Sequence, residues 1–157
     1  MFGKLKTEEI DQLISNQLIG RIGCHANGIT YIVPVSYAYD PPYIYVHTYK
    51  GMKMDMMRQN PDVCFQVDDT RSLAYWQSAI CWGKFEELNE PTSKTQALQK
   101  LQARILPVLS SETMHLSKEW PFPSGENERA DGHFFRIRLT EKTGRFEKIT
   151  GEEFYAT

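Results

Sequence analysis

The residues best placed to do chemistry lie where a predicted strand runs into a predicted helix. His47 and Thr48 end the strand, Lys50 and Gly51 follow, and Lys53 falls in the first helical turn. Free N–H groups at a helix N-terminus attract anions, and a lysine ammonium there adds a charge-assisted contact. We therefore predict that Thr48 and Lys53 form a phosphate site, with Gly51 permitting an awkward backbone step between them and Lys50 and Arg58 adding positive charge close by.

A second group of candidate residues precedes this stretch in the run Val33, Pro34, Val35 and Ser36. Pro34 cannot donate a ladder hydrogen bond, so we expect its strand to be an edge strand or to bulge there. Neighbouring backbone donors and acceptors would then be free. Such groups suit a flat heterocycle with alternating polar atoms along its edge.

The histidines leave two interpretations open. His47, at a strand end, is as consistent with a structural residue as with a catalytic acid, because its partners are not visible in the sequence. The remaining histidines lack metal-ligand spacing with any cysteine or carboxylate pair, so we predict no metal site. These are His25, His115 and His133.

Composition narrows the class of protein. The 157 residues are 41% hydrophobic and 24% charged, which is typical of one packed globular domain, here 1–157. A net charge of −2 supplies no field for nucleic acid or an anionic membrane, so an anionic ligand needs a local basic cluster. No apolar run reaches the roughly 20 residues that span a bilayer, and a cytoplasmic location is expected.

Three cysteines without a CxxC pair are expected to be reduced and buried: Cys24, Cys64 and Cys81.

Periodicity and turn residues predict mostly strands. Asn27-Gly28 is a strong two-residue hairpin signal between a strand that ends near Ala26 and a strand over 29–39. Further strands are predicted over 43–48, 63–67, 75–88 with a bulge or bend at Gly83, 135–139 and 145–149, the last two separated by a turn at Thr143-Gly144.

Three short helices and one long loop complete the prediction. Thr7 is expected to cap a helix with an apolar stripe of Ile10, Leu13 and Ile14. The other helices are predicted over 50–60 and from Thr92 or Ser93 to before Pro107, and the loop over 110–132. This pattern predicts a mainly β fold, a closed or nearly closed antiparallel barrel with few helices.

The order and spacing of several short motifs resemble the pyridoxamine 5′-phosphate oxidase-like FMN-binding split barrels, in particular the branch associated with nitroimidazole resistance. The motifs, which span most of the chain, are Gly20-Arg21-Ile22, Val33-Pro34-Val35-Ser36-Tyr37, His47-Thr48 with Gly51 and Lys53, Asn60-Pro61-Asp62-Val63-Cys64-Phe65, Trp76-Gln77-Ser78, and Gly83 before an acidic stretch.

The resemblance implies a split antiparallel β-barrel with FMN as cofactor. Its site residues would fall into three groups: Val33, Pro34, Val35 and Ser36 along the flavin ring; Thr48, Lys50 and Lys53 at the phosphate; and Gln77 and Ser78 from the next barrel strand. His47 would lie close to the ring. Trp82 is a candidate to cap it, although such an aromatic residue is more often part of a core or an interface.

The resemblance also implies a function and its limits. An arginine-rich strand motif of the vitamin B6 oxidase is missing here, as is its basic C-terminal signature in 151–157, so oxidation of pyridoxamine phosphate is not expected. The leading hypothesis is an FMN-dependent oxidoreductase acting on a small oxidised compound, such as a nitroaromatic, bound near His47 and Trp82. The alternative is a non-catalytic module that stores or senses flavin or haem.

The protein is also predicted to be a homodimer with shared cofactor sites. A small barrel alone offers a flavin ring only a shallow groove. The runs 75–88 and 134–139 carry more large apolar residues than one face of a small core requires, and such a surplus suits an obligate interface. In the family that the chain resembles, each flavin touches both subunits.

Overall fold

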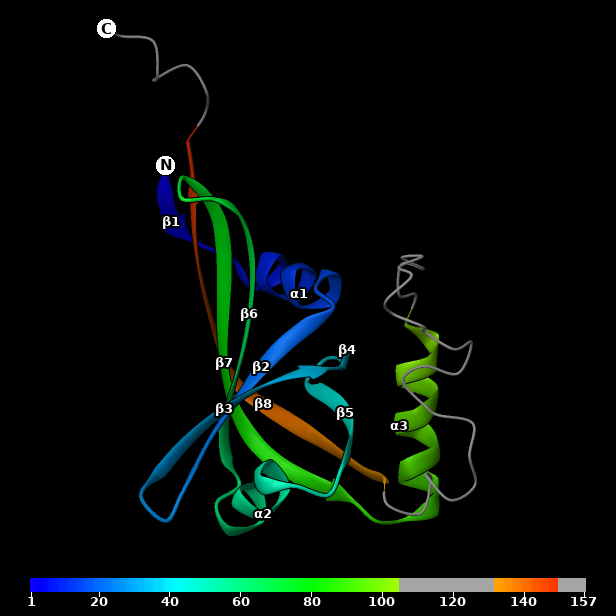
Figure 1. The fold of residues 1–157 in the computed structure, drawn as a ribbon. Coiled ribbons are helices and arrows are strands. Elements are labelled where there is room, and N and C mark those ends of the chain that lie inside the picture. The colour runs from blue at the N-terminus through cyan, green and yellow to red at the C-terminus, as the bar shows by residue number, and fades with distance from the viewer. Residues whose placement is uncertain (105–131, 150–157) are drawn as a thin grey trace, which may run out of the picture.

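The fold is mainly antiparallel β-sheet, as predicted, and the computed structural model describes residues 1–104 and 132–149 (Figure 1). The strands are β1 (Phe2–Lys4), β2 (Ile19–Ala26), β3 (Ile29–Ser36), β4 (Ala38–Asp40), β5 (Tyr43–Tyr49), β6 (Asp62–Ser72), β7 (Tyr75–Leu88) and β8 (Gly132–Lys148). The helices are α1 (Thr7–Asn16), α2 (Met52–Gln59) and α3 (Pro91–Ala103). The predicted loop over 110–132 lies almost entirely outside the described residues.

The strands form one split barrel. Their order in the sheet is β3-β2-β6-β7-β8-β5-β4, and β1 pairs with β8. β3 and β4 stand at opposite ends of this order although only Tyr37 separates them in the chain, so the sheet curls round until its ends come close. The longest pairing in the sheet is between β7 and β8. It runs from the Tyr75–Lys148 pair to the Leu88–Phe134 pair.

Alternate side chains of each strand point to one face of the sheet, and these side chains fill the interior of the barrel. Ile22, Phe65, Ala79 and Ile137 come from four different strands and are completely buried. α1 closes one side of this core, where the hydroxyl of Tyr37 donates to the backbone oxygen of Ile14 at 2.5 Å. The barrel interior is therefore a packed core.

A second, smaller core lies beneath α3 on the other face of the sheet. Its buried members are Ala38, Tyr45, Leu88, Ala97 and Leu101. α3 begins at Pro91, which suits the first helical turn because proline has no N–H to leave unpaired. The described residues contain no helix long and apolar enough to cross a membrane.

Three sequence predictions about the strands are confirmed. Asn27 and Gly28 have φ angles of 53° and 75°, as the two-residue hairpin between β2 and β3 requires. The register of β7 against β8 shifts between Trp82 and Gly83, where a bulge was predicted. Pro34 lies in an edge strand, because β3 stands at one end of the strand order.

Other predictions about the fold are wrong. The predicted strand over 29–39 is interrupted at Tyr37, where β3 ends and β4 begins. The chain does not turn at Thr143-Gly144, because β8 continues without interruption to Lys148. A Cβ at Gly144 would meet side-chain atoms of Leu5 and Ile10 at 2.8–2.9 Å, so close packing rather than a turn explains this glycine. The N-cap of α1 is Lys6 and not Thr7, and the N–H of Lys6 donates to the carboxylate of Glu9.

A further error concerns a thiol. Cys24 and Cys81 are buried as expected, but Cys64 is only partly buried. Its strand position places it on the face of the sheet away from the barrel core, since its neighbours Val63 and Phe65 are the residues that point inward.

Candidate functional site

The edge strand β3 presents its candidate residues to two different sides. Val35 is buried in the barrel core and Val33 packs against it, whereas Pro34 is exposed and Ser36 half-buried. β3 pairs with β2 on one side only, from Ile29 opposite Ala26 to Ser36 opposite Ile19. Its other edge carries no paired strand in the described part of the chain, which leaves backbone groups there available to a ligand.

Thr48 and Lys53 lie at the junction of β5 and α2. Thr48 is a buried polar residue, 8% exposed, and its hydroxyl donates only to the neighbouring Tyr49 carbonyl at 3.2 Å. Lys53 is half-buried, and no hydrogen bond or ion pair with a described residue reaches its ammonium. Burial lowers its pKa, partly offset by interaction with the nearby Cys24 thiol. Among the described residues, Lys53 is thus a cation that lies near Cys24 of β2 and has no anionic partner.

Gly51 is not needed for an awkward backbone step. As the residue before α2 it has φ 179° and ψ −176°, an extended conformation that any residue adopts. A Cβ added there would meet no atom within 4 Å. The prediction that glycine relieves strain at this point is therefore wrong, but the open space beside it adjoins Lys53 and is consistent with a bound group. Lys50, one residue earlier, is exposed, and Arg58 forms ion pairs with Glu87 and Asp55, so its charge is already compensated.

His47 faces the opposite side of β5 from Thr48. Its ring packs against Phe134 and Tyr49, with centroids 4.7 Å and 5.7 Å apart. Burial lowers the pKa of His47, and the nearby His133 lowers it further. A Cβ at Gly132 would lie 2.5 Å from Nε2 of His47, so the imidazole is held tightly. This environment favours the neutral ring.

The candidates on β7 also divide between two faces. Gln77 lines a small polar cavity of about 260 Å³ beneath α1. Ser78 lies on the opposite face, where its hydroxyl accepts a hydrogen bond from the Gln66 side chain at 3.4 Å. Trp82 shares that face and is 42% exposed. We call the side of β3, β2, β6 and β7 that points away from the barrel core the outer face.

Strand spacing separates several candidates within one chain. Pro34 pairs with Arg21 and Arg21 with Gln66, so two strands stand between β3 and β7. Three steps between neighbouring strands amount to about 14 Å. His47 and Trp82 are further apart, because they pair with Phe134 and Glu141 of β8, which are about 20 Å apart along that strand. One chain therefore does not bring the three groups together around a single ring.

Sequence reasoning missed several residues of the outer face. A groove of about 510 Å³ is bordered by Ile32, Cys64, His25 and Trp82, of which only Trp82 was a candidate. The cross-strand row Ile32, Gly23, Cys64 and Trp82 accounts for it, since Gly23 has no side chain and the Cys64 sulfur lies above it. The signal was the period-2 alternation of each strand, but the pairing that aligns the strands was not visible in the sequence.

Known proteins similar to this chain share its fold over nearly its whole length. A model of the family described as "Pyridoxamine 5'-phosphate oxidase" matches residues 6–146. A crystal structure of a FAD-binding protein from Mesorhizobium loti is 30% identical and superimposes with a TM-score of 0.73, covering 94% of this chain and 99% of the other.

Two further relatives extend the comparison. A protein from Bacteroides thetaiotaomicron, described as a proposed 5-nitroimidazole antibiotic resistance protein, has a TM-score of 0.70 at 18% identity and covers 93% of this chain and 87% of its own. A protein from Rhizobium meliloti, described as uncharacterised, is 28% identical over 148 residues, 90% of this chain and 92% of its own. At 18% identity the Bacteroides structure supports the fold alone.

Proposed function

This chain belongs to the pyridoxamine 5′-phosphate oxidase family, and from that premise we propose that it binds FMN. The name of the Mesorhizobium loti relative, a FAD-binding protein at 30% identity, supports a flavin as the ligand. The observation that carries the proposal is Lys53, a half-buried cation without an anionic partner among the described residues. A phosphate there would provide the negatively charged partner that this ammonium lacks among the described residues.

The surroundings of Lys53 fit a phosphorylated flavin. The buried Thr48 hydroxyl, the open space at Gly51 and the first N–H groups of α2 lie at the same junction. Lys53 interacts with Cys24, and Cys24 pairs with Tyr31 of β3, so the phosphate end would lie near the Tyr31 end of that strand. The ring would then follow Val33 to Ser36.

The identity of the ligand is tested by releasing it from the purified protein. Heat or acid denaturation followed by mass spectrometry distinguishes FMN from FAD. Competition with riboflavin then tests the phosphate site, because riboflavin lacks the group that Lys53 would bind. FMN recovered in stoichiometric amount, with riboflavin bound much more weakly, is the expected result. FAD as the bound species, or riboflavin bound as tightly as FMN, contradicts the proposal.

We further propose that the protein is an oxidoreductase acting on a small oxidised compound such as a nitroaromatic. A bound flavin supplies hydride or electron transfer, while the chain positions the ring and the substrate. The neutral His47 ring, packed against Phe134, is suited to shape a pocket rather than to donate a proton at neutral pH. A non-catalytic flavin or haem module is the second candidate, since burial lowers the pKa of His47, the candidate catalytic acid.

The visible spectrum separates these functions. A flavin band that NAD(P)H bleaches and a nitroaromatic restores supports the oxidoreductase. A flavin band that persists in the presence of a range of reductants supports the binding module. A Soret band in place of the flavin band would show that the barrel holds haem.

We also propose that two chains share each cofactor site. The outer face exposes large apolar side chains that a monomer would leave in water, including Ile32 at 67% and Trp82 at 42% exposure. β8 does not add to this surplus, because Phe135 and Ile137 are buried in the barrel core. The separation of about 14 Å between β3 and β7 within one chain also favours a shared site, since β7 of a second chain could supply Ser78 and Trp82.

Mixed dimers test the shared site directly. A Lys53→Met chain and a Trp82→Ala chain each give homodimers with two damaged sites. If the sites are shared, every mixed dimer regains one site with intact Lys53 and intact Trp82, so unfolding and refolding a mixture restores binding in about one quarter of all sites. No recovery above the two separate variants would indicate that each site is built from one chain.

A further inference from the structure

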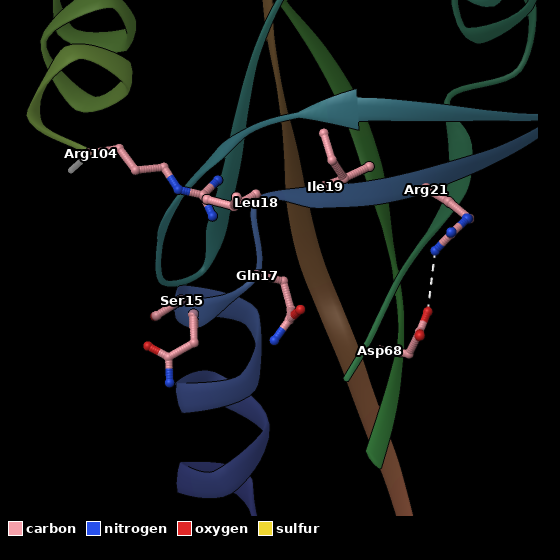
Figure 2. Close-up of a pocket in the computed structure, with 8 residues that line it drawn as sticks. Ser15, Gln17, Leu18, Ile19, Arg21, Asp68 and Arg104 are labelled. Carbon is pink, nitrogen blue, oxygen red and sulfur yellow. Dashed lines mark hydrogen bonds and ion pairs between the residues drawn. The ribbon is translucent and has the colours of Figure 1, made fainter. Parts of the chain in front are cut away.

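A separate cavity of about 780 Å³ lies where the C-terminal end of α1 meets the start of β2 (Figure 2). Its lining residues are Ser15, Asn16, Gln17, Leu18, Ile19, Arg21, Asp68 and Arg104. It is distinct from the proposed phosphate site. Ile19 pairs with Ser36 of β3, whereas the Cys24 neighbour of Lys53 pairs with Tyr31, about 16 Å away along the strand.

The charges around this cavity do not balance. Arg21 and Asp68 form an ion pair at 3.2 Å and neutralise each other. Arg104 donates a hydrogen bond to the backbone oxygen of Tyr37, and its guanidinium lies 4.5 Å from the centre of the Tyr37 ring. No carboxylate of the described residues contacts Arg104. The cavity therefore carries one excess positive charge.

Arg104 is partly buried, so its positive charge is partly removed from water and favours the binding of an anion. Burial lowers the pKa of Arg104, and its contacts with Tyr37 offset this only in part. A guanidinium has five N–H donors in a planar fork that matches a carboxylate, and the structure uses few of them. A cation removed from water gains most from an anion that can reach it, and the cavity provides the access.

The remaining lining indicates what else the anion would carry. Leu18 and Ile19 present aliphatic surface, 36% and 47% exposed, between Arg104 on one side and the Arg21–Asp68 pair on the other (Figure 2). The amides of Asn16 and Gln17 and the hydroxyl of Ser15 border the same space. An apolar body with one negatively charged end matches this arrangement.

We propose that this cavity binds a small organic carboxylate, with its carboxylate on Arg104 and its apolar body against Leu18 and Ile19. A single uncompensated cation matches the single charge of a carboxylate better than the larger charge of a phosphate. Asp68 stands at the far end of the cavity and repels further negative charge there. The cavity borders the position proposed for the flavin ring, because Ile19 and Arg21 pair with Ser36 and Pro34 of β3.

Benzoate is a suitable probe, and isothermal titration of the purified full chain measures its affinity. Benzoate is expected to bind and neutral benzamide to bind much more weakly. Arg104→Gln should weaken benzoate by at least about tenfold, as the loss of a charge-assisted hydrogen bond implies. The control Arg71→Gln removes the same charge from an exposed side chain outside the cavity and should leave the affinity unchanged.

A second variant keeps the proposal testable if Arg104→Gln does not fold. This variant is expected to bind benzoate more tightly than the native protein does. Asp68→Asn keeps an oxygen acceptor but raises the net charge of the cavity, so benzoate should bind severalfold more tightly. Absence of benzoate binding to the native protein, equal losses in the two arginine variants, or weaker binding by Asp68→Asn would overturn the proposal. Inorganic phosphate that binds as tightly as benzoate, and that Arg104→Gln weakens equally, would overturn the choice of a carboxylate.

Discussion

Two half-buried cations, Lys53 and Arg104, carry the proposed ligand chemistry of this chain at the level of single residues. Both lack a carboxylate partner among the described residues, and burial lowers the pKa of both. Lys53 was predictable, because its place after Thr48 and Gly51 at a helix start is visible in the sequence. Arg104 was not, because its meaning depends on Tyr37 and Ile19, which only the fold brings near it.

Replacing Lys53 with Met tests the phosphate site. The variant should lose on the order of 1.5–3 kcal/mol of FMN affinity, the worth of a charge-assisted hydrogen bond, while riboflavin affinity changes little. Lys50→Met should lose less, because Lys50 is exposed and screened by water. Lys4→Met, on the exposed strand β1, serves as the control. Fluorescence titration measures all three, and equal losses for FMN and riboflavin would mean that the phosphate lies elsewhere.

His47 should make folding stability depend on pH below the ordinary histidine range. Its folded pKa is lowered from 6.5 by burial and by His133. As pH falls below 6.5, the unfolded chain takes up the proton before the folded chain does, so stability is lost down to the folded pKa. Urea unfolding of a His47→Asn variant should show a smaller loss between about pH 7 and pH 5.

An NMR titration of the His47 ring checks the premise. Its signals should shift at a pH below the value of an exposed histidine, and His133→Asn should move that midpoint upward. A His47 ring that titrates at or above the ordinary value would contradict the buried position described here.

At the level of elements, the sequence was most informative where the backbone itself constrains the residue type. Asn27-Gly28 predicts a hairpin because both residues tolerate positive φ, and Pro34 predicts an edge because it lacks an N–H. Gly144 led to the wrong prediction of a turn, because a glycine can also allow close packing, here against Leu5 and Ile10. Local patterns do not distinguish a turn from a close tertiary contact.

Gly83 should be the least replaceable glycine of the long β7–β8 ladder. A Cβ there would overlap the backbone oxygen of Arg138, which cannot rotate away as a side chain does. Gly83→Ala should therefore destabilise the protein by about 1–3 kcal/mol through overpacking. Gly51→Ala is the matched control, because its backbone is extended and the space around it is open.

Chemical denaturation of the two glycine variants compares them. A stability of Gly83→Ala equal to that of the native chain would show that the bulge relaxes freely. A Gly51→Ala variant as unstable as Gly83→Ala would indicate that the junction before α2 is packed more closely than the structure shows.

At the level of the whole molecule, the account depends on two chains meeting at the outer face. Within one chain, β3 and β7 lie about 14 Å apart, and Ile32 and Trp82 remain exposed. The alternation of β7 made its apolar surplus predictable. Which of its residues lie on the outer face was not predictable, because strand order and register decide it.

Sedimentation velocity recorded at both the protein and the flavin absorption bands tests this central proposal most directly. If each flavin is held by two chains, dilution should release flavin and dissociate the dimer together, because a ligand that binds only the dimer stabilises it by mass action. The flavin signal should then sediment only with the dimer and appear as free ligand wherever monomer is present. A monomer that sediments at micromolar concentration with bound FMN would contradict the account and place the flavin in a site built by one chain.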